Sequence, residues 1–298
     1  MKVKKKIKRA VLSDFDLKLF EFLWKWKVST TAALSARFYP HKNLRRAYNR
    51  LLILEKAGLI QSRADIRGER FLWTLTREGY RRIRHLLPLE LAEEGFESKT
   101  LGHDLLCSAV LAGDWLLLKS PPDLIRVTDQ QLSRLKKDDY PVAVSSQHRA
   151  DGYWYYDTPK KLIALEVQIS RQKLKDYEEV GEFYEDQAHV ETVLWVVERI
   201  SMSHGILSGL KRTGWGGKEE RSTKKHNFVS FENFFKNGYD ARIEVGELTG
   251  ITIHQLLSAN LKTPLALPSE KSVKKLLDVR KSPHSAKNER FYVPGDAW

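Results

Sequence analysis

Apolar residues recur at helical spacing through the first part of the chain. A first helix is predicted from Asp14, and its apolar residues are Phe15, Leu19, Phe20, Leu23 and Trp24. A shorter helix follows over residues 30–38, which Ser29 or Thr30 can cap. A longer helix begins at Asn43 and ends at Gly58. We expect its apolar stripe to consist of Leu44, Tyr48, Leu51 and Leu52.

The pattern then changes from helical spacing to strands. Residues 59–76, "LIQSRADIRGERFLWTLT", predict two strands around a turn at residues 65–68. Thr76 can cap a further helix over residues 77–87. The first 87 residues therefore predict three helices, a two-stranded hairpin and a fourth helix, after a basic arm at residues 1–10.

A second pattern starts at Pro88 and favours a mixed sheet with helices. A helix is predicted from residue 101, followed by a short strand and a helix within residues 123–137. Two strands, "GYWYYD" and "KLIALEVQIS", flank a turn at residues 158–160. A helix over residues 170–187 and an apolar strand over residues 190–199 come next. Residues 214–228 are Gly-rich and charged and predict an exposed loop, and residues 227–245 predict late short strands.

These elements predict an α/β (α+β) protein of two domains, 1–87 and 88–280, with a tail at 281–298. Cys107 is the single cysteine, so no internal disulfide forms, and we expect a reducing compartment such as the cytoplasm. No apolar run reaches the roughly 20 residues needed to span a bilayer, and the basic start has no signal-peptide core. We therefore expect no membrane association.

The positive charge is concentrated in the first domain. The chain has a net charge of +13, and residues 1–87 contain 22 Lys and Arg against 7 Asp and Glu. The remaining residues contain 29 against 31. A concentrated positive field indicates a polyanion partner, nucleic acid first and anionic membrane second. The alternative is a basic surface that serves solubility alone.

The element order of residues 14–87 resembles a winged helix-turn-helix. The phrases "RLLILEKAGLI" and "LTREGY" are similar to the end of that family's recognition helix and to its last helix. The resemblance implies binding of double-stranded DNA through the major groove. The residues that it implies near DNA are Lys42, Arg45, Arg46 and Arg50 on the helix, with Arg67 and Arg70 on the wing. A protein-docking module is the alternative.

Glu166 and Gln168 interrupt an otherwise apolar strand. Because strand side chains alternate, both residues share the face of Leu162 and Ala164. The hairpin that begins near Asp151 returns the chain beside Glu166. Two carboxylates on neighbouring strands can bind Mg²⁺ or Mn²⁺, which polarises a phosphate and activates water.

This order resembles the PD-(D/E)xK nuclease superfamily, in which an Asp, a hairpin and a Glu-x-Lys strand form the site. Asp151 and Glu166 match the two acids, and the resemblance implies that they hold the metal. Gln168 stands in place of the lysine, and Lys173 or Lys175 can substitute for it. A solvated strand edge and a degenerate nuclease fold that binds DNA without cutting it are the alternatives.

Taken together, residues 14–200 resemble the replication-relaxation family, which includes MobC-type mobilisation proteins. "LGHDLL" with His103 fits this family, whereas Ala150 replaces the expected proline. The resemblance implies DNA mobilisation or replication together with a relaxase. The second domain is expected to engage the same DNA or a melted single strand, and Trp215 in the Gly-rich segment can stack on a base. The alternatives are a non-catalytic DNA-binding regulator or adaptor, and a nuclease of another mobile element.

Overall fold

The computed structural model describes ten stretches of the chain. They are residues 11–39, 43–64, 70–87, 97–98, 100–112, 124–129, 148–156, 161–188, 190–212 and 221–258. The chain divides into two compact units, Met1–Ser108 and Ala109–Trp298. The boundary that we predicted at Pro88 and the predicted tail lie outside the described residues. In this part of the chain no helix combines the length and apolar character that crossing a membrane requires.

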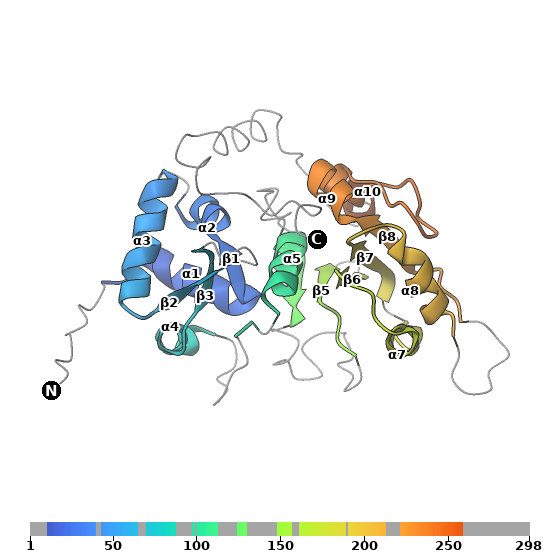
Figure 1. Ribbon diagram of the computed structural model, residues 1–298, viewed down its shortest axis with the longest axis horizontal. Helices are drawn as coiled ribbons and strands as arrows, with labels where there is room; N and C mark the ends of the chain where they lie inside the picture. Colours follow the sequence, from blue (N-terminus) through green and yellow to red (C-terminus); the bar gives the residue numbers. More distant parts are fainter. Residues whose placement is uncertain are drawn as a thin grey trace. The chain divides into compact units, whose positions relative to one another are not determined.

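The first unit combines helices with a three-stranded antiparallel sheet (Figure 1). Its elements are α1 (Asp14–Trp26), β1 (Val28–Thr30), α2 (Thr31–Phe38), α3 (Leu44–Lys56), β2 (Ile60–Ala64), β3 (Arg70–Leu75), α4 (Arg77–Ile83) and η1 (Arg84–Leu86). The strand order is β1-β3-β2. The predicted helices and the β2–β3 hairpin are confirmed, and β1 adds a third strand, in which Val28 pairs with Thr74.

Side-chain caps explain where these helices begin. Ser13 and Asp16 form a reciprocal capping box at the start of α1. Thr30 accepts the N–H of Ala33 at α2, and Thr76 accepts that of Gly79 at α4. Each cap satisfies an N–H group that has no partner within its helix.

The apolar stripe of α3 differs from the predicted one. Ala47, Leu51 and Leu54 are the buried residues of α3. Leu51 is buried as predicted, whereas Leu44, Tyr48 and Leu52 are only half-buried, so the sequence prediction was wrong about these three. The stripe is rotated toward Ala47 because α3 packs on α2 and on the hairpin, and a small side chain allows that close approach.

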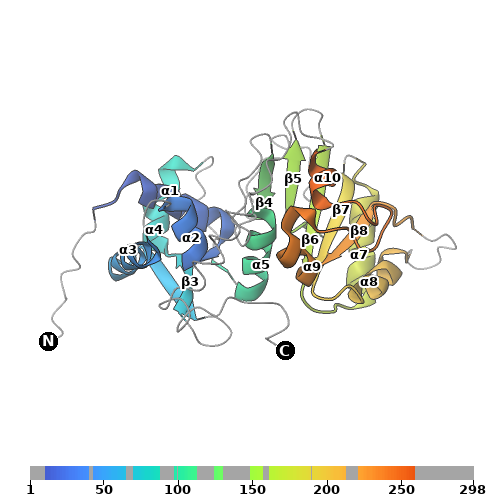
Figure 2. The same ribbon diagram turned by 90° about the horizontal axis from the view of Figure 1, so that it is seen from above.

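The second unit is built around a five-stranded mixed sheet with helices on both faces (Figure 2). Its elements are the end of α5 (Leu101–Ala112), β4 (Ile125–Thr128), β5 (Gly152–Tyr156), β6 (Lys161–Gln168), α7 (Leu174–Glu185), β7 (Val190–Val197), α8 (Met202–Leu210), β8 (His226–Ser230), α9 (Phe231–Asn237), η3 (Gly238–Asp240) and α10 (Ile253–Ser258). The strand order is β4-β5-β6-β7-β8. Neighbours from β4 to β6 are antiparallel, and those from β6 to β8 are parallel.

Each face of this sheet has its own packing. Leu162 and Ala164 of β6 lie in one buried cluster with Trp195 and with residues of α7 and α8. Trp154 of β5 belongs to the other face, where its Nε1 donates to the carbonyl oxygen of Leu111, 3.3 Å away, at the end of α5. The alternation that we predicted for β6 is therefore confirmed, and α7 covers the face of Glu166.

Two predictions near the end of the unit were wrong. Residues 231–237 form α9 and not a strand, because Ser230 caps a helix and Phe231 and Phe234 bury their rings at helical spacing. The predicted exposed loop ends before His226, where buried strand β8 begins. Part of the predicted late strands is confirmed, because residues 227–230 belong to β8 and isolated bridges join Phe228 to Val245 and Arg242 to Thr252.

Arg221 joins two segments of the second unit. Its buried guanidinium donates to the carbonyl oxygen of Arg212 at 2.6 Å and to Glu185 Oε2 at 2.6 Å. Its backbone N–H donates to the carbonyl oxygen of Lys211 at 3.0 Å. The chain therefore leaves α8 and returns toward β8 at one fixed point beside α7.

Candidate functional site

Two of the exposed arginines of the first unit lie at the start of α3. Arg45 and Arg46 are in the first turn, which has no acidic residue, and both side chains are exposed. Asn43 caps this turn by accepting the backbone N–H of Arg46 at 2.9 Å. Cations at a helix N-terminus oppose the helix dipole, so their position costs stability unless an anion is present.

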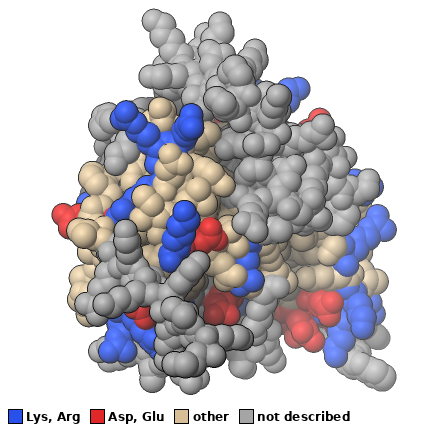
Figure 3. Space-filling view, turned by 60° about the vertical axis from the view of Figure 1, so that its left-hand side comes forward, with Lys and Arg blue, Asp and Glu red and all other residues tan. Residues whose placement is uncertain are grey.

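The other predicted DNA-contacting residues differ in their surroundings. Lys42 and Arg67 lie outside the described residues, and Arg70 begins β3 with its side chain not described. Arg50 is turned inward and bound to Asp16. Figure 3 shows Lys and Arg side chains in several separate groups on the face that it draws, with Asp and Glu between some of them.

Asp16 is a buried carboxylate that collects donors from three helical segments. Arg50 Nε and Nη2 lie 3.0 and 2.5 Å from its two oxygens, and Tyr39 OH donates at 3.1 Å. Ser13 donates its N–H and hydroxyl, both at 2.7 Å. Burial alone raises the pKa of Asp16, but the hydrogen bonds from Arg50 and Ser13 outweigh it and lower the pKa below its usual value.

The second candidate site lies where β5 and β6 run side by side. Gly152 pairs with Leu165, which places Asp151 beside the β6 residues that follow Leu165. Asp151 Oδ2 accepts the backbone N–H of Val167 at 2.7 Å. The hairpin thus places the Asp151 carboxylate against the β6 backbone next to Glu166, as the sequence predicts.

Glu166 is buried and accepts two side-chain donors on one oxygen. His148 Nε2 lies 2.8 Å from Glu166 Oε1, and the hydroxyl of Tyr184 on α7 donates to the same oxygen. The rings of Phe183 and Tyr184 pack edge-on against His148, at centroid distances of 5.1 and 5.8 Å. The carboxylate is therefore held from one side by a histidine and from the other by a helix.

The three polar groups change each other's ionisation. Burial raises the pKa of Glu166, and the nearby Asp151 charge adds to that effect, while His148 and Tyr184 oppose it. Burial favours the neutral His148 ring, but the Glu166 charge, the hydrogen bond with Glu166 and the Asp151 charge together outweigh burial and raise the pKa of His148. Burial and the Glu166 charge raise the pKa of Tyr184 well above its usual value, so this hydroxyl acts as a donor.

The residues proposed to replace the missing lysine do not lie at Glu166 in this arrangement. The side-chain amide of Gln168 donates to the carbonyl oxygen of Ser170. Lys173 is exposed just before α7, and Lys175 Nζ lies 3.9 Å from Glu179 Oε1 one turn further along that helix. His148 is the nitrogen-bearing side chain that contacts Glu166 instead.

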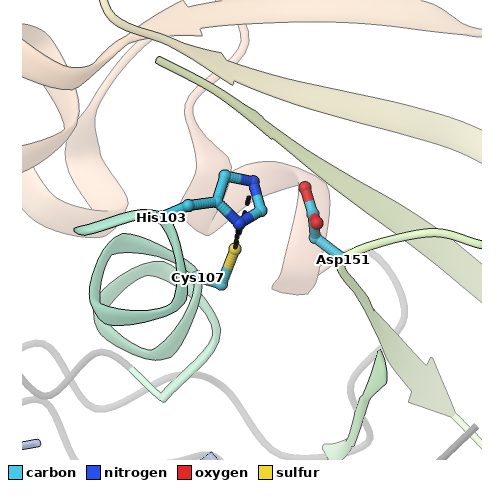
Figure 4. Close-up of side chains that lie close together, drawn as sticks. All are labelled: His103, Cys107 and Asp151. Carbon is cyan, nitrogen blue, oxygen red and sulfur yellow. Dashed lines mark hydrogen bonds between the residues drawn. The ribbon is translucent and has the colours of Figure 1, made fainter. Parts of the chain in front are cut away.

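His103 and Cys107 contact each other on successive turns of α5. Cys107 Sγ lies 3.5 Å from His103 Nδ1 (Figure 4). Figure 4 also draws Asp151, which precedes β5. The division between the two units falls after Ser108, so His103 and Cys107 belong to the first unit and Asp151 to the second. Trp215 lies outside the described residues.

His148 and Tyr184 are the site residues that the sequence reading missed. His148 precedes the first acid by only three residues, which was an available signal. Tyr184 follows Tyr177 by two helical turns on the buried side of α7, and a buried tyrosine hydroxyl requires a polar partner.

No family model, no curated protein and no solved structure matches the chain.

Proposed function

We propose that this chain is a DNA-binding protein whose first unit docks on duplex DNA as a winged helix. The observation that carries the proposal is the pair of exposed arginines in the first turn of α3. Several other described helices have acids there, Asp14 and Asp16 in α1, Glu78 in α4, Asp176 in α7 and Glu232 in α9, whereas α2, α8 and α10 have neither an acid nor an arginine in the first turn. α3 instead combines two cations with the positive end of the helix dipole, an arrangement that a phosphate stabilises.

The element order supports this reading. α2 and α3 follow each other through a short connection, and the β2–β3 hairpin comes directly after α3. In a winged helix the second helix of the pair enters the major groove and the hairpin lies beside it. α3 lies on the outer side of its unit in Figures 1 and 2. Arg50 is excluded from the contact set because Asp16 already holds it.

The proposal is tested with two matched double variants. Arg45→Ala/Arg46→Ala removes two charges from α3, and Arg81→Ala/Arg82→Ala removes two exposed charges from α4, where both pair with Glu78. We expect the α3 variant to bind duplex DNA more weakly and to reduce the slope of log K against log salt by about 2. The α4 variant should retain the wild-type slope. Equal losses in both variants would assign the binding to overall charge and not to α3.

For the second unit we propose a nuclease-like role in which Asp151 and Glu166 hold Mg²⁺ or Mn²⁺ next to DNA. The order Asp151, hairpin, Glu166, helix α7 and parallel strand β7 supports the resemblance to PD-(D/E)xK nucleases. The cation would polarise a phosphate and activate water. Work at an origin of transfer or replication together with a relaxase remains part of this proposal.

A second candidate function is a non-catalytic regulator or adaptor with a degenerate nuclease fold. It is favoured by one observation: the amide of Gln168 is turned to Ser170, and Glu166 Oε1 already has two donors. Cleavage assays on single-stranded, supercoiled and branched DNA with Mn²⁺ separate the candidates. Cleavage that Glu166→Ala abolishes supports the nuclease, and DNA binding without cleavage supports the regulator.

A further inference from the structure

The rotation of α3 about its own axis is fixed from both flanks. Tyr48 packs edge-on against Trp73 of β3 at a centroid distance of 6.1 Å. Glu55 Oε1 accepts the N–H of Ser62 on β2 at 2.8 Å, which holds the same flank further along. On the opposite flank Arg50 is bound to Asp16. With the buried stripe beneath, these contacts leave one defined face of α3 pointing outward.

Four residues form one ridge along that outward face, beside the exposed Arg46. Arg45, Asn49, Ile53 and Lys56 are all exposed and recur at spacings of four, four and three. Four residues of an α-helix advance about 6 Å along its axis, so the ridge runs parallel to the helix. Ile53 is 48% exposed, so its apolar side chain is available to a partner of α3.

The middle of this ridge does not fit a surface that contacts phosphates only. Arg45 and Lys56 at its two ends can pair with phosphate, whereas Asn49 is neutral and Ile53 is apolar. The major groove presents both complementary groups. An asparagine amide pairs with the N6 and N7 atoms of adenine, and an aliphatic side chain contacts the methyl group of thymine.

We propose that Asn49 and Ile53 make the unit sequence-selective, with Asn49 reading an adenine and Ile53 contacting a thymine methyl group. This inference rests on the proposed function, because it requires α3 in the major groove. Asn49 and Ile53 are separated by about 6 Å along the helix, so their two contacts fall on base pairs close together in the groove. The DNA that the unit selects therefore contains A·T pairs near each other.

The experiment selects binding sites from a random duplex library with the full chain. The wild type should enrich one sequence, and Asn49→Ala should lose the preference for adenine at one position by about 5- to 150-fold. Gln61→Ala is the matched control, because it removes an exposed amide from β2 of the same unit. Affinity for unselected DNA should be the same in all three proteins.

The contact of Ile53 is tested by replacing thymine with deoxyuracil in the selected site, which removes only the methyl group. The wild type should bind the deoxyuracil duplex several-fold more weakly, and Ile53→Ala should bind both duplexes equally. Thermal melts of Asn49→Ala and Ile53→Ala should match the wild type, because both side chains are exposed.

The outcomes separate this inference from the proposed function. A wild type that binds DNA without sequence preference, or an Asn49→Ala variant with unchanged preference, overturns the inference and leaves DNA binding intact. A wild type that binds no duplex DNA overturns both and assigns the ridge to another partner. A preference lost in Asn49→Ala and kept in Gln61→Ala supports the inference.

Discussion

Arg50 Nη2 lies 2.5 Å from Asp16 Oδ2, so the third helix of the first unit is tied to the first helix by a buried charge. Asp16 has no exposed side-chain surface, and a quarter of the Arg50 side chain remains exposed. Arg50 Nη2 also donates to the carbonyl oxygen of Val11 at 2.7 Å. Arg50 therefore has an architectural role, although its place in the sequence predicts a DNA contact.

Arg50→Ala should destabilise the protein by about 3 kcal/mol, because removal of one partner leaves the buried Asp16 charge without its cation. The measurement is denaturant unfolding at pH 7. Asp16→Asn/Arg50→Met removes both charges and should recover part of the loss. Comparable unfolding of Arg50→Ala and the wild type would show that Ser13 and Tyr39 hold Asp16 on their own.

The same carboxyl group predicts a loss of stability in acid. The pKa of Asp16 is lowered in the fold, so its contribution is present above the unfolded value of 3.8 and is lost as the pH falls through the folded value. Asp16→Asn should flatten this part of the curve of melting temperature against pH. If the melting temperature of the variant fell with acidification as steeply as that of the wild type, the prediction would be contradicted.

The Glu166–His148 pair predicts the opposite pH dependence, in which stability falls as the pH rises. The pKa of each group is raised in the fold, so the folded protein holds protons that the unfolded chain releases above 4.5 and 6.5, respectively. The stability that the pair contributes is complete at low pH and is lost as the pH rises through the folded pKa values. Glu166→Gln should flatten the curve of melting temperature against pH where the pH passes through the folded pKa values. Glu191→Gln, an exposed control on β7, should leave that curve unchanged.

Mn²⁺ or Mg²⁺ should stabilise the wild type by an amount that follows RT ln(1 + [L]/Kd). Glu166→Ala should remove that stabilisation, because it removes one of the two carboxylates. Thermal melts and calorimetry at one pH measure the stabilisation by the cation in the wild type and its loss in the variant. His148→Gln distinguishes competition from cooperation: tighter Mn²⁺ binding in this variant means that His148 and the cation compete for Glu166.

Protonation of His226 predicts a second, independent loss of stability at acidic pH. Burial, with the nearby Lys225 charge, lowers the pKa of His226 to about 3, and its Nδ1 accepts the indole N–H of Trp195 at 3.0 Å. Its contribution to stability is therefore present above the unfolded value of 6.5 and is lost as the pH falls toward 3. His226→Phe should weaken the dependence of stability on pH in this range. It should also lower the free energy of unfolding by about 1–3 kcal/mol at pH 7, because Trp195 loses its hydrogen-bond acceptor.

Two glycines in helices predict opposite responses to alanine. A Cβ at Gly79 of α4 would lie 2.0 Å from the carbonyl oxygen of Leu59, whereas one at Gly205 of α8 would meet nothing within 4 Å. Gly79→Ala should destabilise by roughly 3 kcal/mol, because backbone must move. Gly205→Ala should stabilise by about 0.5–1 kcal/mol through helix propensity. Chemical denaturation of both variants measures this contrast.

The sequence predicts elements well where periodicity and caps agree. Ser13, Thr30, Asn43 and Thr76 stand at the starts of four helices of the first unit, and each accepts a backbone N–H. Glu166 was predicted to share a face with Leu162 and Ala164 because strand side chains alternate with a fixed period of two. These features depend on a few neighbouring residues, so the sequence alone carries them.

Features that depend on distant partners were missed. The inward turn of Arg50 requires Asp16, which is 34 positions earlier in the chain. The contact of His148 with Glu166 requires the register between two separated segments. Residues 231–237 fell within the predicted late short strands, although the Ser230 cap and the spacing of Phe231 and Phe234 mark a helix there. Long-range pairing is not encoded in local periodicity, so the partners of Arg50 and His148 could not be assigned from the sequence, whereas α9 had local signals that were overlooked.

The hydrogen bonds that Arg221 makes beside α7 have a practical consequence for engineering the protein. Its contacts with Lys211 and Arg212 close the chain on either side of residues 213–220 independently of what lies between them. A doubled loop length costs only about 0.6 kcal/mol in closure entropy. A fluorescent reporter or affinity tag inserted within residues 213–220 should therefore leave the fold intact, provided that Arg221 is kept. Such a fusion would allow the protein to be followed while both ends of the chain stay native.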